Sequence, residues 1–106
     1  MIARLWHGIV LTEKAEDYHA FLVQSGLKDF AETPGNKGYF LLKKTSEGSI
    51  THFYTLSLWE NMDVIKNFSG EEVHKPRYYP EDAGYLLEFE TSVEHLQVLE
   101  FRVNGQ

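Results

Sequence analysis

The 106-residue sequence contains no cysteine. Disulfide bonds, thiolate nucleophiles, iron–sulfur clusters and thiolate zinc sites are therefore excluded. The five histidines do not recur at the spacing of a metal-binding motif, so the sequence predicts no metal site. A chain without cysteine also fits a reducing compartment, and we expect a cytoplasmic protein.

Long apolar stretches and an excess of positive charge are also missing. No apolar run approaches the ~20 residues that span a bilayer, and we see no basic segment followed by an apolar one, the pattern of a signal peptide. With 16 acidic and 10 basic residues, the net charge is −6. Because phosphate binding requires a basic surface, we expect neither nucleic acid nor a membrane as a partner.

The most informative stretch is residues 50–59, Ile-Thr-His-Phe-Tyr-Thr-Leu-Ser-Leu-Trp. Its β-branched and aromatic residues predict one long strand. Because side chains alternate in a strand, Phe53 and Trp59 share one face, and Tyr54 and Leu56 share the other. A sheet that is apolar on both faces must be covered twice. In a chain this short, helices can cover one face and a second copy of the chain the other.

Three further strands are predicted from runs of strand-forming residues with alternating faces. They lie at residues 2–10, 38–45 and 93–103. A turn at residues 46–49 joins the 38–45 strand to the central one.

Two helical segments connect these strands. Thr12 is the predicted N-cap of the first helix, because its hydroxyl can accept a hydrogen bond from an amide of the first turn. Gly26 is expected to break this helix, since glycine is a poor helix former. Asn61 is the predicted cap of the second helix, and a capping-box spacing predicts a helical turn at residues 71–75.

The resulting order is strand, helix, strand, strand, helix, strand, which is a split βαβ arrangement. We expect a four-stranded, mainly antiparallel sheet whose central pair is parallel, with helices on one face. The first and last strands are neighbours in this topology, which would bring His7 close to His95. The bare apolar face would cause a monomer to aggregate, so we predict a homodimer that pairs two such faces.

Three short stretches carry a resemblance to a known family. Trp59-Glu60-Asn61 after the aromatic strand, residues 2–8 and residues 32–38 resemble the corresponding parts of antibiotic biosynthesis monooxygenase domains. These domains belong to the dimeric α+β barrel superfamily. The resemblance implies one α+β domain over residues 1–106, a ferredoxin-like protomer that pairs into a dimeric barrel, with a pocket between helices and sheet.

The resemblance also bears on chemistry. Some members of the family oxidise aromatic polyketides with molecular oxygen and no cofactor, and related members bind haem and degrade it. Catalytic members have an asparagine on the first strand, a tryptophan ending the third and a histidine on the second helix. Trp59 matches the tryptophan, but Arg4, Trp6 or His7 stands near the asparagine position, and His74 comes only after the helix. Haem is therefore disfavoured, and we expect no cofactor.

Two candidate residues lie on predicted strands. His7 is a candidate general base, because the reference pKa of histidine lies near 6.5; the alternative is a structural role in the strand. Trp59 either lines a substrate pocket or anchors the core at the strand–helix junction, since large aromatic side chains dominate cores.

Four further candidates lie in one predicted loop: His74, Arg77, Tyr78 and Tyr79. Such a loop can close over a flat aromatic ligand, and Arg77 can bind a phenolate or carboxylate. The alternative is that the tyrosines pack the loop against the sheet edge or a dimer partner, while Arg77 pairs with Glu81 or Asp82.

The sequence thus predicts a cofactor-independent monooxygenase that oxidises a phenolic or polycyclic aromatic compound with O2. We assign proton transfer to His7 or His74 and anion stabilisation to Arg4 or Arg77. The substrate-binding candidates are Arg4, Trp6, Trp59, Tyr78 and Tyr79. The alternatives are a non-enzymatic dimeric module that binds a small hydrophobic ligand or only itself, and a protein that binds or degrades haem.

Overall fold

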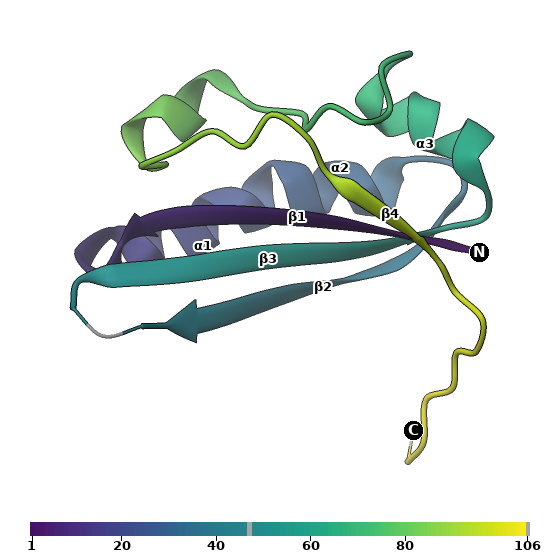
Figure 1. The fold of residues 1–106 in the computed structure, drawn as a ribbon, viewed down its shortest axis with the longest axis horizontal. Helices are drawn as coiled ribbons and strands as arrows, with labels where there is room; N and C mark the ends of the chain where they lie inside the picture. Colours follow the sequence, from purple (N-terminus) through teal and green to yellow (C-terminus); the bar gives the residue numbers. More distant parts are fainter. Residues whose placement is uncertain (47, 106) are drawn as a thin grey trace.

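The computed structural model describes residues 1–46 and 48–105 and has two layers, a sheet and a set of helices (Figure 1). The strands are β1 (Ile2–Leu11), β2 (Asn36–Thr45), β3 (Ile50–Trp59) and β4 (Glu94–Gln97). The helices are α1 (Ala15–Gln24), α2 (Gly26–Glu32) and α3 (Met62–Ser69), with short 3-10 turns η1 (Thr12–Lys14) and η2 (Pro80–Gly84). This is the predicted α+β, ferredoxin-like fold.

The sheet has the order β2-β3-β1-β4, and each neighbouring pair is antiparallel. The expected parallel central pair is wrong, because Ile2 of β1 lies opposite Trp59 of β3 and Leu11 lies opposite Ile50. The crossover through α1 and α2 makes β1 and β2 parallel. The hairpin then reverses the chain, and β3 inserts between them in the opposite direction.

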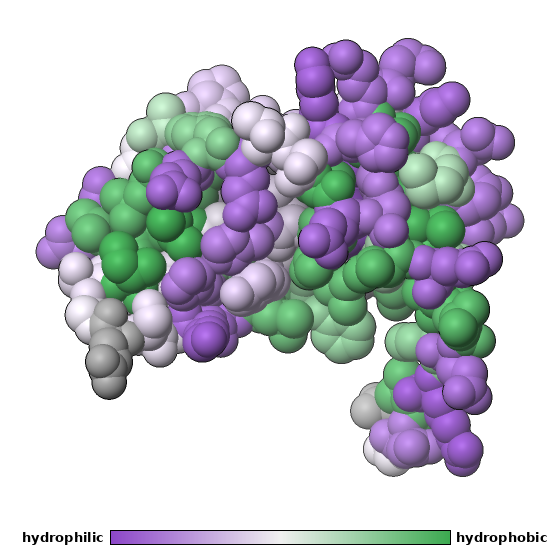
Figure 2. Space-filling model, in the orientation of Figure 1, coloured by the Kyte–Doolittle hydropathy of each residue, from purple (hydrophilic) through white to green (hydrophobic). Residues whose placement is uncertain are grey.

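Alternation along the strands divides the sheet into two faces, as predicted. Phe53, Trp59 and Val10 are buried in the core beneath the helices. Seven of the apolar residues on the other face are Leu5, Ile9, Phe40, Leu42, Tyr54, Leu56 and Leu96. We refer to this set as the open face. The helices α1 and α2 lie behind the sheet in Figure 1, and Figure 2 shows apolar side chains at the surface on the viewer's side.

The helix boundaries follow the sequence at two of three predicted positions. The helical segment is interrupted between α1 and α2, directly before Gly26. The Asn61 side chain caps α3 by accepting a hydrogen bond from the Val64 amide at 3.0 Å. Thr12 does not cap a helix, which corrects that prediction. Its hydroxyl instead forms a hydrogen bond with the Thr51 hydroxyl at 2.8 Å, because Thr12 directly follows the end of β1 that pairs with the start of β3.

Two predicted elements are shorter or absent. The strand expected at 93–103 pairs only over Glu94–Gln97, and the following tail extends away from the sheet (Figure 1). The reason is that β4 has only the start of β1 as a neighbour, so the ladder runs out of partners. The helical turn expected at 71–75 is replaced by irregular turns. The turn predicted at 46–49 includes residue 47, which lies outside the described residues.

Within the described ranges, no helix combines the length and apolar character needed to cross a bilayer.

Candidate functional site

A cavity lies between the helices and the covered face of the sheet. Its walls come from β1, β3, the helices and the segment that leads from α3 through η2 towards β4. The lining residues are Arg4, Trp6, Tyr18, Leu22, Phe30, Thr55, Phe68, Pro76, Arg77, Tyr78, Tyr79, Asp82 and Val93. The cavity offers about 50 Å³ to the centres of water molecules, and one water needs roughly 10–15 Å³ on this measure. It therefore has room for a few waters.

Trp6 reaches the cavity by lying over Gly8. A Cβ atom at residue 8 would fall 2.6 Å from Cζ2 of Trp6, so only glycine leaves room for the indole. The Trp6 Nε1–H group donates to the Tyr78 hydroxyl at 3.3 Å, and that hydroxyl donates to the Glu90 carbonyl at 2.8 Å. This chain of two hydrogen bonds ties the Tyr78 segment to the first strand.

Arg4 is the buried cation of the cavity, with 3% of its surface exposed. Its guanidinium donates to the Val73 carbonyl at 2.5 Å and to the Lys75 carbonyl at 2.9 Å, and it lies 3.0 Å from Nε2 of His95. No carboxylate in residues 1–46 or 48–105 forms an ion pair with it. Burial lowers the pKa of Arg4 to about 10, which leaves it protonated at neutral pH.

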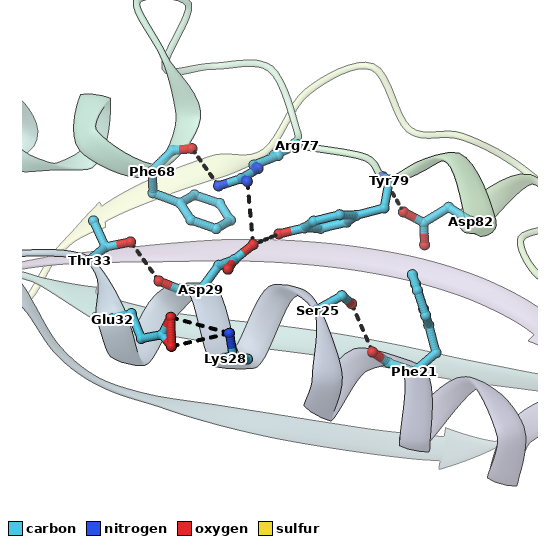
Figure 3. A network of polar contacts seen from close by, with 10 residues as sticks. All are labelled: Phe21, Ser25, Lys28, Asp29, Glu32, Thr33, Phe68, Arg77, Tyr79 and Asp82. Carbon is cyan, nitrogen blue, oxygen red and sulfur yellow. Dashed lines mark hydrogen bonds and ion pairs between the residues drawn. The ribbon is translucent and has the colours of Figure 1, made fainter.

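A second cation of the cavity lining is Arg77, which lies in the loop after α3. Figure 3 shows Arg77 and Tyr79 converging on Asp29 of α2: Nη2 of Arg77 lies 3.3 Å from Oδ2 of the carboxylate, and the Tyr79 hydroxyl donates to the same oxygen. Arg77 also donates to the Phe68 carbonyl at 3.2 Å and lies over the Phe68 ring. We call Asp29, Arg77 and Tyr79 the latch. The partner of Arg77 is therefore Asp29, not Glu81 or Asp82.

Asp82 is a buried carboxylate in the cavity wall, with 3% of its surface exposed. Its Oδ1 accepts from the Tyr18 hydroxyl at 2.9 Å, and its Oδ2 accepts from the Tyr79 amide at 2.7 Å. The neighbouring carboxylates and burial together raise the pKa of both tyrosines, with burial the larger cause. Both phenols therefore remain neutral donors at physiological pH.

The predicted site residues separate into two groups. Five of them line the cavity: Arg4, Trp6, Arg77, Tyr78 and Tyr79. Trp59, His7 and His74 do not. Trp59 is fully buried in the core, where its Nε1–H group donates to the Ser57 hydroxyl at 2.8 Å and its ring packs against Phe30.

Four of the five histidines form two pairs, and none of these four lines the cavity. His7 lies on the opposite side of the sheet, where its Nδ1 donates to Glu90 at 2.6 Å and its Nε2 lies 2.8 Å from Nδ1 of His52. His95 lies opposite Arg4 in the ladder, so His7 and His95 do not meet. The His74 ring is near the ring of His95, with centroids 5.7 Å apart. Among the described residues, no group of three acidic or histidine side chains could hold a metal ion.

Two cavity residues with ionisable side chains were not among the predicted site residues. Tyr18 follows the apolar stripe of α1 and reads as core, and Asp82 lies next to Glu81 in a polar loop. One local signal exists for Asp82, because its carboxylate accepts from the Tyr79 amide at the start of η2. Such a cap predicts that the carboxylate is held in one orientation, but it does not predict that the carboxylate lines a cavity.

The cavity residues do not suit a haem. Haem iron in proteins takes an axial histidine, cysteine, methionine or tyrosine, and the described lining contains only tyrosine from this set. Burial raises the pKa of Tyr18, Tyr78 and Tyr79, which disfavours the phenolate that would bind iron. The space in this cavity is also far below that of a porphyrin.

No protein-family model and no curated protein matches this sequence. Solved structures match it in fold. A "Putative antibiotic biosynthesis monooxygenase from Nitrosomonas europaea" has a TM-score of 0.63 and 14% identity, covering 94% of this chain and 100% of that one. A protein from Bacillus cereus with the same description has a TM-score of 0.64 and 14% identity, covering 95% and 97%.

A third structure is the haem degrader MhuD from Mycobacterium tuberculosis, with two haems bound in its active site. Its TM-score is 0.61 at 12% identity, and the match covers 97% of this chain and 100% of that one. At such identities the likeness concerns the fold. The chain therefore has the fold of structures described as antibiotic biosynthesis monooxygenases, as the resemblance around Trp59-Glu60-Asn61 implied.

Proposed function

We propose that this protein is a cofactor-independent monooxygenase for a phenolic or polycyclic aromatic compound. The observation that carries the proposal is one cavity with aromatic walls that also contains a buried guanidinium, Arg4, and a buried carboxylate, Asp82. Aromatic walls accept a flat ring. The carboxylate can take a proton from the substrate, and the guanidinium can stabilise the anion that results.

The chemistry requires a substrate that reduces O2 once it has lost a proton. An anthrone is the simplest case: its CH2 group and O2 become a carbonyl group and one water. The four electrons come from the substrate carbon, and no metal or flavin takes part. A cation fixed in a buried site stabilises the anion that forms first, and Arg4 is the cavity cation without a carboxylate partner among the described residues.

We assign the role of base to Asp82. A carboxylate has about four acceptor positions, and Tyr18 and Tyr79 occupy one on each oxygen. An acceptor position therefore remains for a substrate proton. This assignment replaces His7 and His74, because neither histidine lines the cavity.

Substrate entry requires movement of the loop. The cavity has room for only a few waters, so an aromatic ring enters only when the segment carrying Arg77 and Tyr79 moves away from α2. The latch to Asp29 holds that segment in place.

The test is oxygen consumption by purified protein with a panel of anthrones and naphthohydroquinones. We expect turnover above the uncatalysed rate, a loss of at least about tenfold in Arg4→Met and Asp82→Asn, and little change in Lys66→Gln, whose exposed side chain lies near Glu71. Absence of turnover with every compound would overturn the proposal.

A second candidate is a non-enzymatic module that binds a small aromatic ligand. It is favoured by the small cavity and by the hydrogen bonds that each phenol of the lining already makes to protein. Binding of an aromatic compound without oxygen consumption would identify this function.

We also propose that the protein is a homodimer through the open face. Phe40, Leu42 and Leu96 are each nearly half exposed there, and burying such a surface stabilises an association of two copies. A two-fold axis would place the same patch of each copy against the other.

A further inference from the structure

Among residues 1–46 and 48–105, the guanidinium of Arg4 has hydrogen-bond donors without an acceptor. An arginine side chain has five N–H groups, and three are directed at Val73, Lys75 and His95. The two that remain are on Nε and Nη2, which are neighbours in the guanidinium plane. All three present partners are uncharged acceptors, so the positive charge of Arg4 is not compensated by them.

The contact with His95 fixes the state of that imidazole. Arginine can only donate, so Nε2 of His95 must accept the hydrogen bond at 3.0 Å. The neutral ring then carries its hydrogen on Nδ1, which is buried and has no hydrogen-bond partner in the described structure. Burial, the charge of Arg4 and the charge of His74 all lower the pKa of His95, which favours this neutral form.

His95 therefore orients the Arg4 guanidinium by accepting a hydrogen bond as a neutral ring, without adding charge to the site. It lies opposite Arg4 in the β1–β4 ladder, while the Val73 and Lys75 carbonyls approach from the segment after α3. The Phe68 ring lies 5.9 Å from Cζ of Arg4. Together these contacts hold the guanidinium plane in one orientation at the cavity wall.

From this arrangement we infer that the ligand of the cavity is an aromatic carboxylate, bound through its two oxygens by Nε and Nη2 of Arg4, with His95 as a positioning residue. Two neighbouring donors match the two oxygens of a carboxylate, and paired donors of this kind are the preferred mode of arginine for such groups. The aromatic part of the ligand would contact Trp6 and Tyr78. This inference rests on the proposed function, because it names the class of compound for the same cavity.

The probes are 2-naphthoate and 2-naphthamide, which have the same shape but differ in charge, with binding measured by calorimetry. We expect the wild-type protein to bind the carboxylate at least about tenfold more tightly than the amide. Arg4→Met should abolish that preference. Arg4→Lys keeps the charge and loses the paired donors, so it should retain only part of the preference and also shows whether the site tolerates substitution. Lys66→Gln, which removes an exposed positive charge on α3, should retain all of it.

The role of His95 has its own readout. Nitrogen-15 NMR should find the neutral His95 ring protonated on Nδ1 in the wild type. His95→Gln, which keeps an acceptor near the position of Nε2, should preserve the preference for the carboxylate, and His95→Leu should reduce it several-fold while 2-naphthamide binds as before. Equal losses for both probes in His95→Leu would show a merely structural role and remove His95 from the proposal.

Equal binding of the two probes by the wild type, or no binding of either, overturns the carboxylate inference. A preference that persists in Arg4→Met also overturns it. These outcomes are independent of oxygen consumption. A protein that oxidises anthrones but shows no preference refutes the inference alone, and one that prefers 2-naphthoate but consumes no oxygen with any aromatic compound refutes the monooxygenase proposal alone.

Discussion

The indole of Trp6 occupies the space that any side chain at residue 8 would need. A Cβ added at Gly8 would lie 2.6 Å from Cζ2 of Trp6 and 2.9 Å from a methyl of Leu86. A glycine in the middle of a strand weakens that strand, and here the missing side chain is what lets an aromatic wall of the cavity lie flat on the sheet.

Gly8→Ala should displace Trp6 from the cavity. We expect a loss of about 1–3 kcal/mol in the free energy of unfolding, because the added methyl overpacks the site, together with weaker binding of aromatic probes. Denaturant titration and calorimetry measure the two effects. The matched control is Gly26→Ala, where a Cβ has open space and where alanine should be neutral or stabilising by up to about 1 kcal/mol. Equal stability of Gly8→Ala and the wild type would contradict the packing of Trp6.

Asp29→Asn should loosen the latch. The change removes the charge that pairs with Arg77 and weakens the acceptor of the Tyr79 hydroxyl. Because both members of the ion pair are partly exposed, we expect a loss of only about 1 kcal/mol in stability, with faster amide hydrogen exchange in the loop and faster association of aromatic probes. Glu32→Gln, which breaks the exposed Lys28–Glu32 pair on the same helix, should leave both rates unchanged. Unaltered exchange at residues 77–79 in Asp29→Asn would show that the latch does not hold the loop.

The His95 imidazole should make the protein less stable in mild acid. Its pKa in the folded state is lowered below the ordinary value of 6.5, so the unfolded chain binds the proton more readily. The stabilising contribution is complete above pH 6.5 and is lost as the pH falls from 6.5 through the lowered folded-state value. Denaturation between pH 4.5 and pH 7.5, the range suggested by the ordinary histidine pKa of roughly 6.5, should show a smaller slope for His95→Gln than for the wild type. Identical slopes would mean that His95 does not titrate in this way.

Leu42→Glu should dissociate the proposed dimer. Light scattering should give the wild type a mass near twice 12.3 kDa, and the charged variant a mass near that of one chain, because a carboxylate on the open face would be buried without a partner. Val23→Glu is the control, since Val23 on α1 has the same 46% exposure as Leu42 but lies on a helix. A wild-type monomer at micromolar concentration would refute the dimer.

The elements of this fold follow from local patterns in the sequence. The alternation in residues 50–59 determines which side chains share a face, because the period of a strand is two whatever lies beside it. The helix break at Gly26 and the cap at Asn61 are equally local, since each depends on backbone groups a few residues away. Trp59 illustrates the limit of such evidence. Its position in the strand can be predicted from the sequence, but its contacts with Ser57 and Phe30 cannot.

The orientation of β3 and the length of β4 depend on neighbours that are distant in the sequence. Local alternation is the same in parallel and antiparallel ladders, so it could not exclude a parallel central pair. The apolar alternation after Gln97 is strand-like, but a strand requires a partner, and none of the described strands lies beside that tail.

Local patterns in the sequence are enough to predict the α+β class, the double-sided sheet, the resemblance in fold and the aromatic loop that carries Arg77, Tyr78 and Tyr79. That Arg4 and His95 form one site, that Asp82 lines the same cavity and that His7 lies on the other side of the sheet is seen only in the folded chain. These contacts depend on strand register and on the path of a loop across the sheet, which bring together residues separated by more than 70 positions. Secondary-structure periodicity carries no information about either.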